Sequence, residues 1–198
     1  MKKLATGAVL GVLLIVVMGV VQSVSAADTA LAERLTRLGL EVIEEVPAGI
    51  TPLELKTLGE VRSLLRSGCS DRVVLTERLE LSVGGEQTAV TRAIDIRQLH
   101  YSYICNPVWR TRFNLWADVY VEASGSFHWI DDVRSIRVGL TGLHPFMRLV
   151  DTYTDDYIYS NQQRVRIEGG GTLEYYLFIQ GILTCYSEPA YIVAYYLI

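Results

Sequence analysis

RFNLWADVYVEA, residues 112–123, alternates apolar and polar side chains without a break. This alternation predicts a β-strand with one buried face and one face in contact with water. The apolar set is Phe113, Leu115, Ala117, Val119, Val121 and Ala123, and the opposite set is Arg112, Asn114, Trp116, Asp118, Tyr120 and Glu122. The wet face therefore carries two large rings among its charges, and their role there is the main question that the sequence raises.

Further strands are predicted along most of the chain. The pattern is β from Arg72 onward, with predicted strands at 73–82, 88–104, 108–123, 127–140, 147–160, 163–168, 172–184 and 191–198. Turn residues separate these strands, including "GGG" at 169–171 and "SEPA" at 187–190. Short connections between consecutive strands favour antiparallel meanders. The sequence predicts a mainly β fold, either an antiparallel β-sandwich or a closed barrel of about eight strands.

Two helices are expected ahead of the strands. Leucines at positions 31, 35 and 38 have helical spacing, and Gly39 follows them as a C-terminal cap. Thr57 and Glu60 form a capping-box pattern that predicts a second short helix ending near Ser67. Every Phe, Trp and Tyr of the chain lies after residue 100. We therefore expect a helix-containing N-terminal extension over residues 27–70 and an antiparallel β domain over residues 71–198.

The N-terminus has the pattern of an export signal. Lys2 and Lys3 precede the apolar run "LATGAVLGVLLIVVMGVV", and "VSA" ends at Ala26 with small residues at the positions that a signal peptidase reads. We predict a signal peptide over residues 1–26 and a secreted, extracellular protein. The alternative is a retained membrane anchor with the rest of the chain facing outside, because the apolar run approaches the length that spans a bilayer.

Charge and composition exclude several classes of function. The full chain has a formal net charge of −4, and loss of Lys2 and Lys3 with the signal peptide makes it more negative. An acidic chain without a basic patch disfavours nucleic acid as a partner. His100, His128 and His144 are far apart, and no Cys-x-x-Cys or His-x-x-x-His spacing occurs, so we expect no metal site and no cofactor.

Three cysteines, Cys69, Cys105 and Cys185, are present. An oxidising compartment permits a disulfide, and an odd number leaves one thiol over. Cys105 and Cys185 each end an apolar run shortly before a proline. We predict a bond between Cys105 and Cys185, with three free thiols as the alternative.

One group of residues could carry catalysis. In "SGSFHWIDDVRSIRVGL" the apolar positions change phase near Asp131 and Asp132, as an inserted residue in a β-bulge would cause. Bulges recur beside active sites, so His128, Asp131 and Asp132 are candidates for acid/base hydrolysis, or for holding Ca²⁺. The simpler interpretation is that these carboxylates cap backbone N–H groups that the bulge leaves unpaired.

A second group of residues could bind a ligand. The stretch "DTYTDDYIYS", residues 151–160, repeats the mixture of rings and charges found beside Trp116. Rings flanked by polar groups can hold a sugar ring or a polymer on a sheet face, and the candidate residues are Trp116, Tyr120, Asp118, Asn114, Tyr153 and Tyr157. Such rings also stabilise a solvated sheet through cross-strand pairing, without any ligand.

Two segments, "EVPAGITPLELKTLGEV" at 45–61 and "YVEASGSFHWIDDVRSIRVGLTG" at 120–142, resemble parts of uncharacterised secreted proteins of Gram-positive bacteria. The resemblance implies secretion and a β-rich body, and it transfers no catalytic residue. We therefore expect a secreted, non-catalytic β domain that binds an extracellular ligand, such as a polysaccharide or the cell wall, or serves as a structural surface component. A secreted hydrolase that uses His128, Asp131 and Asp132 is the alternative.

Overall fold

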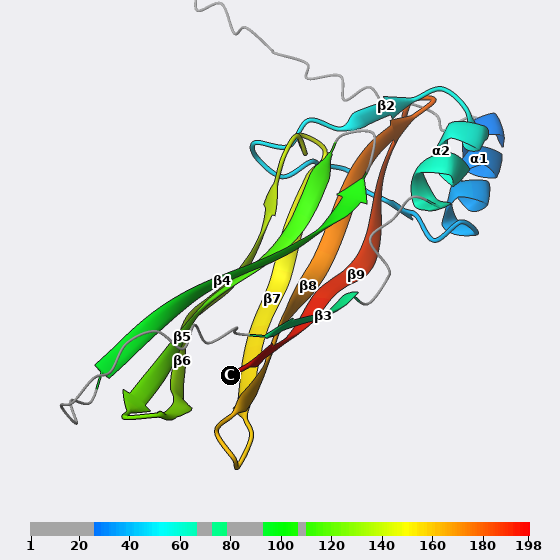
Figure 1. The fold of residues 1–198 in the computed structure, drawn as a ribbon. Helices are drawn as coiled ribbons and strands as arrows, with labels where there is room; N and C mark the ends of the chain where they lie inside the picture. The colour runs from blue at the N-terminus through cyan, green and yellow to red at the C-terminus, as the bar shows by residue number, and fades with distance from the viewer. Residues whose placement is uncertain (1–25, 67–72, 79–92, 107–109) are drawn as a thin grey trace, which may run out of the picture.

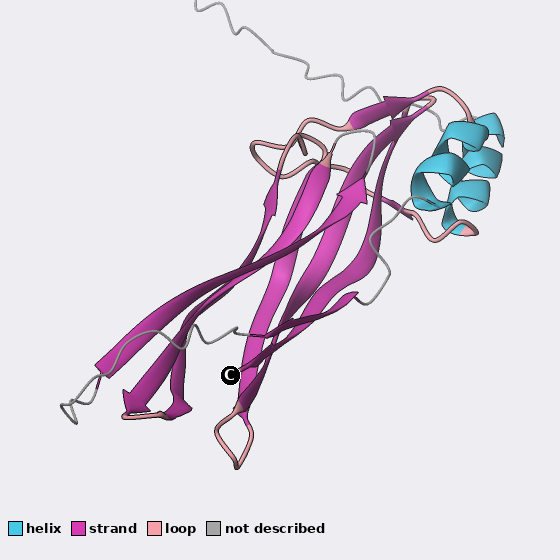
Figure 2. Cartoon of the chain, viewed as in Figure 1, coloured by secondary structure: helices cyan, strands magenta, loops and turns pink. Residues whose placement is uncertain are grey.

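The computed structural model describes residues 26–66, 73–78, 93–106 and 110–198. Within them it contains two helices and nine strands (Figures 1 and 2). In chain order the elements are α1 (Ala26–Thr36), β1 (Glu41–Val42), β2 (Leu53–Leu55), α2 (Leu58–Arg66), β3 (Val73–Arg78), β4 (Ala93–Asn106), β5 (Thr111–Ser124), β6 (Phe127–Thr141), β7 (Met147–Ile158), β8 (Arg164–Ile179) and β9 (Ile182–Leu197). The predicted mainly β fold is confirmed. Apart from Ala26, the predicted signal peptide lies outside the described residues.

The larger sheet, sheet A, is built around β8 and β9. These two strands pair antiparallel from Arg164 opposite Leu197 to Ile179 opposite Ile182. The other edge of β8 is covered by β7, which is antiparallel, and by β2, which is parallel. The other edge of β9 is covered by β1, which is antiparallel, and by β3, which is parallel. Two pairings are therefore parallel, which the expected meanders did not include.

The smaller sheet, sheet B, consists of β4, β5 and β6 in antiparallel order, with β5 in the centre. In the described part of the chain no strand pairing joins sheet B to sheet A, so the pairings do not close into a barrel. The strands of both sheets run along the length of an elongated molecule, and the two helices lie at one end of it (Figure 1).

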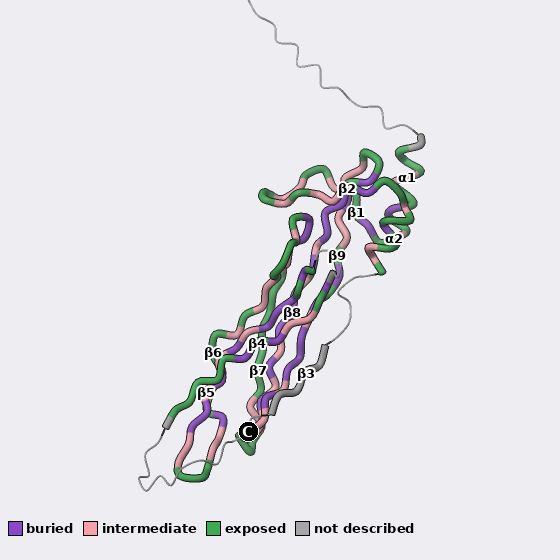
Figure 3. Tube along the Cα trace, turned by 45° about the horizontal axis from the view of Figure 1, so that its top comes forward, coloured by how far each residue is buried: buried purple, intermediate pink, exposed green. Residues whose placement is uncertain are grey.

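The apolar face of β5 forms part of a core shared by the two sheets. Phe113, Leu115 and Val119 are fully buried there, as the alternation in the sequence predicts. Sheet A contributes the facing side chains from β8 and β9, which are buried along most of their length (Figure 3). Each face of sheet A and sheet B that points away from this core is called its outer face below.

The N-terminal helices form as the sequence predicts. Gly39 follows α1 with a positive φ of 82°, as a C-terminal cap requires. At the start of α2 the Thr57 hydroxyl accepts a hydrogen bond from the Glu60 amide at 3.2 Å, and the Glu60 carboxylate accepts one from the Thr57 amide at 3.2 Å. This reciprocal pair is the predicted capping box. Neither helix is long and apolar enough to cross a membrane.

The glycine run at 169–171 is not a turn, contrary to the prediction. It lies in the middle of β8, where both faces of the strand are approached closely. A Cβ atom on Gly169 would lie 2.5 Å from Val138 Cγ1 and 2.9 Å from Leu115 Cδ1, and one on Gly170 would lie 2.7 Å from the Tyr153 ring. Glycine is therefore needed here for close packing and not for chain reversal.

The "SEPA" segment is also part of a strand and not the predicted turn. Pro189 lies within β9 opposite Thr172. In the part of the chain that the structure describes, β1 covers β9 only as far as Cys185 and β3 begins only at Ile192. Pro189 thus lies where one edge of β9 has no partner strand, and proline is tolerated at such edges because it lacks an N–H group. The chain reverses instead at Gly181, which has a φ of 91°.

The predicted bond between Cys105 and Cys185 is wrong. Cys185 is a free thiol, whereas Cys105 is disulfide-bonded. Cys105 is buried at the end of β4 in sheet B, and Cys185 lies opposite Tyr176 on the outer face of sheet A. The Cys105 side chain therefore lies in the core, whereas that of Cys185 points away from it. Cys69 lies outside the described residues.

We expect Gly169→Ala to lower the free energy of unfolding by about 1–3 kcal/mol, because its Cβ atom would overlap side chains of sheet B. Gly59→Ala in α2 is the control, since its Cβ atom would meet nothing closer than Thr57 Oγ1 at 3.6 Å. Urea unfolding followed by circular dichroism measures both. Equal stability of the Gly169 variant and the unmodified protein would contradict this packing.

Candidate functional site

The outer face of sheet B carries the residues that the opening segment singles out. We call it the tryptophan face and define it by three rows that run across β4, β5 and β6. The rows are His100–Trp116–Arg137, Gln98–Asp118–Arg134 and Ile96–Tyr120–Asp132. Because paired residues in antiparallel strands share a face, each row projects to the same side of the sheet.

Two β-bulges in β6 assemble these rows. The register shifts between Tyr120 and Val121, where Asp131 is the extra residue, so the predicted bulge is present. It shifts again between Trp116 and Asp118, near Ser135, whose φ is 54°. Residues three apart in a regular strand point to opposite faces, and the second bulge instead brings Arg134 and Arg137 to the same face.

The two rings of the tryptophan face are held by cross-strand partners. His100 stacks on Trp116 with ring centroids 5.2 Å apart and an interplanar angle of 4°. From the other neighbouring strand, the Arg137 guanidinium carbon lies 5.2 Å from the Trp116 ring centroid. The Arg134 guanidinium lies 4.7 Å from the Tyr120 ring centroid. Trp116 is thus flanked on both sides, so it forms a wall and not an open stacking platform.

Buried Asn114 fixes the orientation of His100. The Asn114 amide nitrogen donates to the carbonyl oxygens of Arg112 and Gly139 at 2.9 and 3.3 Å, and it lies 3.0 Å from the Thr141 hydroxyl. Its oxygen therefore faces His100 and accepts a hydrogen bond from Nε2 at 3.0 Å. A neutral His100 then carries its proton on Nε2, and the opposite ring edge presents Nδ1 as an acceptor.

A hollow of about 440 Å³ lies between the first two rows. The stacked row of His100, Trp116 and Arg137 forms one wall, and Gln98, Asp118 and Ser135 form the other. Leu99 and Ala117 lie between these walls at its floor. The walls contain a cationic donor, Arg137, and an anionic acceptor, Asp118, together with neutral hydrogen-bonding groups such as Gln98. A polar ligand requires a lining of this kind.

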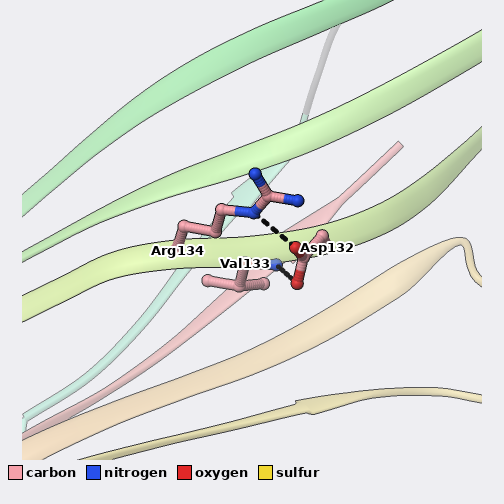
Figure 4. Close-up of polar contacts among 3 residues, drawn as sticks. All are labelled: Asp132, Val133 and Arg134. Atoms are coloured by element: carbon pink, nitrogen blue, oxygen red, sulfur yellow. Dashed lines mark hydrogen bonds and ion pairs between the residues drawn. The ribbon is translucent and has the colours of Figure 1, made fainter.

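The structure does not bring His128, Asp131 and Asp132 together for catalysis. His128 is paired with Ala123 on the inward-facing side of sheet B, whereas Asp132 is paired with Tyr120 on the outer face. The Asp132 carboxylate accepts hydrogen bonds from the Val133 amide at 2.8 Å and from Arg134 Nε at 2.6 Å (Figure 4). The bond from Arg134 holds the pKa of Asp132 below its ordinary value of 3.8. Asp132 therefore acts as a cap, as the simpler interpretation predicts.

Tyr153 and Tyr157 belong to a different surface from Trp116. They are paired with Gly170 and Arg166 on the outer face of sheet A, on the other side of the core. The ring of Tyr153 covers Gly170, and Tyr157 meets Tyr159 edge-on at 5.1 Å between centroids. The six candidate ligand residues therefore do not form one site, and Trp116, Tyr120, Asp118 and Asn114 remain together on the tryptophan face.

Sequence reasoning missed two polar features. The His100–Asn114 pair could have been found, because strands 88–104 and 108–123 were predicted as neighbours. The buried pair of Tyr175 and Glu188, joined by a hydrogen bond of 2.6 Å, could not have been, because Glu188 was assigned to a turn. Burial, followed by the bond to Glu188, raises the pKa of Tyr175 well above its ordinary value of 10.0.

Comparison with known proteins does not assign the chain to a family. No family model matches the sequence, and neither a curated protein nor a solved structure is significantly similar to it. In the described residues no three His, Cys, Asp or Glu side chains are grouped so that they could hold a metal ion.

We expect Asn114→Ala to lower the free energy of unfolding by about 1–3 kcal/mol and to release the imidazole of His100. Nitrogen NMR spectra at pH 8, where free histidine is neutral, report the tautomer. The Nε2–H form of His100 should give way to a mixture in the variant. His144 is the internal control, because its Nδ1 bonds to the Gly142 carbonyl at 2.8 Å and should not change. An unchanged His100 would contradict its fixation by Asn114.

Proposed function

We propose that this protein is an exported, non-catalytic β-sandwich that binds an extracellular ligand on the outer face of sheet B. The ligand is a surface polymer, either a polysaccharide or the cell wall. Support for export comes from the sequence of residues 1–26. Support for a sandwich comes from the two sheets that bury side chains against each other, as Leu115 and Val138 do against Gly169.

The main support for this proposal is the hollow beside Trp116. In its lining the buried amide of Asn114 fixes His100, and the bulge near Ser135 brings Arg137 to the same face. A pre-organised hydrogen-bonding group such as His100 reduces the conformational entropy that the protein loses when a ligand binds. A purely structural sheet would need the stacked rings but not a hollow lined by His100, Gln98 and Asp118.

The outer face of sheet A is a weaker candidate for the same role. Tyr153 is 49% exposed, yet its ring already packs over Gly170, where it replaces the missing side chain. Arg164 lies over the rings of Tyr159 and Tyr195 at 4.8 and 4.2 Å. These contacts account for the rings as stabilisers of the sheet, so this face serves as the comparison surface in the test.

The test is co-sedimentation of the purified protein with bacterial cell walls and with insoluble polysaccharides. Gln98→Trp fills the hollow from the exposed strand β4 and should abolish retention without changing the circular dichroism spectrum. Ile94→Trp is the matched control, because Ile94 is 62% exposed on the same face of the same strand but outside the hollow.

The outcomes separate the possible roles. Retention lost in the Gln98 variant and kept in the Ile94 variant supports a binding site in the hollow. Retention lost only in Tyr157→Ala would move the site to the outer face of sheet A. Retention of the unmodified protein on none of the materials would overturn the proposal and favour a structural surface component.

A further inference from the structure

Two side chains of the hollow carry charges that no ion partner in the described part of the chain matches. On the tryptophan face Arg134 pairs with Asp132 at 2.6 Å, and elsewhere on β4 Arg97 pairs with Asp95 at 2.5 Å. Among the described residues no carboxylate lies within ion-pairing distance of Arg137, whose contact is the ring of Trp116. Asp118 likewise has no cationic partner in the described residues, although Arg134 is its neighbour in register.

These two charges stand on opposite walls. Arg137 belongs to the row of Trp116, and Asp118 belongs to the next row along the sheet. Both line the same hollow, and they do not pair with each other. A guanidinium matches a carboxylate through two parallel hydrogen bonds, and a carboxylate accepts hydrogen bonds from an ammonium group. The hollow is thus complementary to a group that carries both charges.

The alternatives fit the charges less well. A uniformly anionic polymer would be attracted by Arg137 but repelled by Asp118 and by the net charge of −4. A neutral sugar chain would gain hydrogen bonds but would leave the two opposite charges unmatched. A polymer that carries carboxylate and ammonium groups side by side has little net charge and can satisfy both walls.

We infer that the hollow recognises a zwitterionic group, an amino-acid unit with a free carboxylate and a free ammonium, as the peptide parts of a bacterial cell wall carry. The carboxylate is bound by Arg137, and the ammonium is bound by Asp118. Gln98 and Ser135 supply neutral hydrogen-bonding groups on the wall of Asp118. This inference rests on the proposed function, because it names the chemistry of the ligand in the same hollow.

The experiment compares retention on four insoluble materials: peptide-bearing cell wall, the same wall with its amino groups acetylated, glycan strands freed of peptide, and cellulose. The unmodified protein should be retained on the first and at least about tenfold more weakly on the other three, which is the loss expected when one charge-assisted hydrogen bond is removed. Arg137→Gln and Asp118→Asn should each weaken retention on the first material by a similar factor.

Two control variants test whether any effect is specific to the hollow. Arg97→Gln and Asp131→Asn remove the same charges outside the hollow and should leave retention unchanged. Far-ultraviolet circular dichroism and the urea midpoint of unfolding verify that each variant keeps its fold. Equal retention of the unmodified protein on acetylated and untreated wall, or no effect of either hollow variant, would overturn the zwitterionic ligand while leaving the proposed function intact. Retention on none of the four materials would overturn both.

Discussion

The structure depends on the absence of side chains at Gly169 and Gly170 in the middle of β8. Gly169 allows Leu115 and Val138 of sheet B to approach the backbone of sheet A, and Gly170 allows the ring of Tyr153 to lie across the other face. Any larger residue at Gly169 would push the two sheets apart, because packed cores have little free volume. This close approach fixes sheet B, so that β5 buries its apolar face and presents Trp116 and Asp118 to solvent.

The bulges of β6 then determine what accompanies these residues. The extra residue near Ser135 brings Arg134 and Arg137 to one face, and the extra residue at Asp131 leaves Asp132 free to accept hydrogen bonds from Val133 and Arg134. Without these insertions the alternation of a strand would direct half of these side chains into the core. Local irregularity in β6 thus places Arg137 beside Trp116 and Arg134 beside Tyr120.

Much of the fold could be predicted from the sequence, and the exceptions have physical causes. The alternation of residues 112–123, the capping box at Thr57 and the bulge near Asp131 are local patterns, and each is present in the structure. The glycine run and Pro189 were predicted as turns, because the strand partners that make them suitable for β8 and β9 are distant in sequence. The candidate site was predicted only in part, because two residues share a face only if their strands join the same sheet, and the sequence does not show which sheet a strand joins. Tyr153 and Trp116 have similar neighbours in sequence but lie on opposite outer faces.

The central claim is that the hollow beside Trp116 is the ligand site. The most direct measurement is a nitrogen NMR titration of the histidine side chains with soluble fragments released from bacterial cell wall by muramidase. His100 lines the hollow and has its Nδ1 edge free of Asn114, whereas His144 lies outside it. The account predicts a saturable shift of the His100 Nδ1 resonance while that of His144 stays constant. Binding of the fragments with no change at His100 would contradict it.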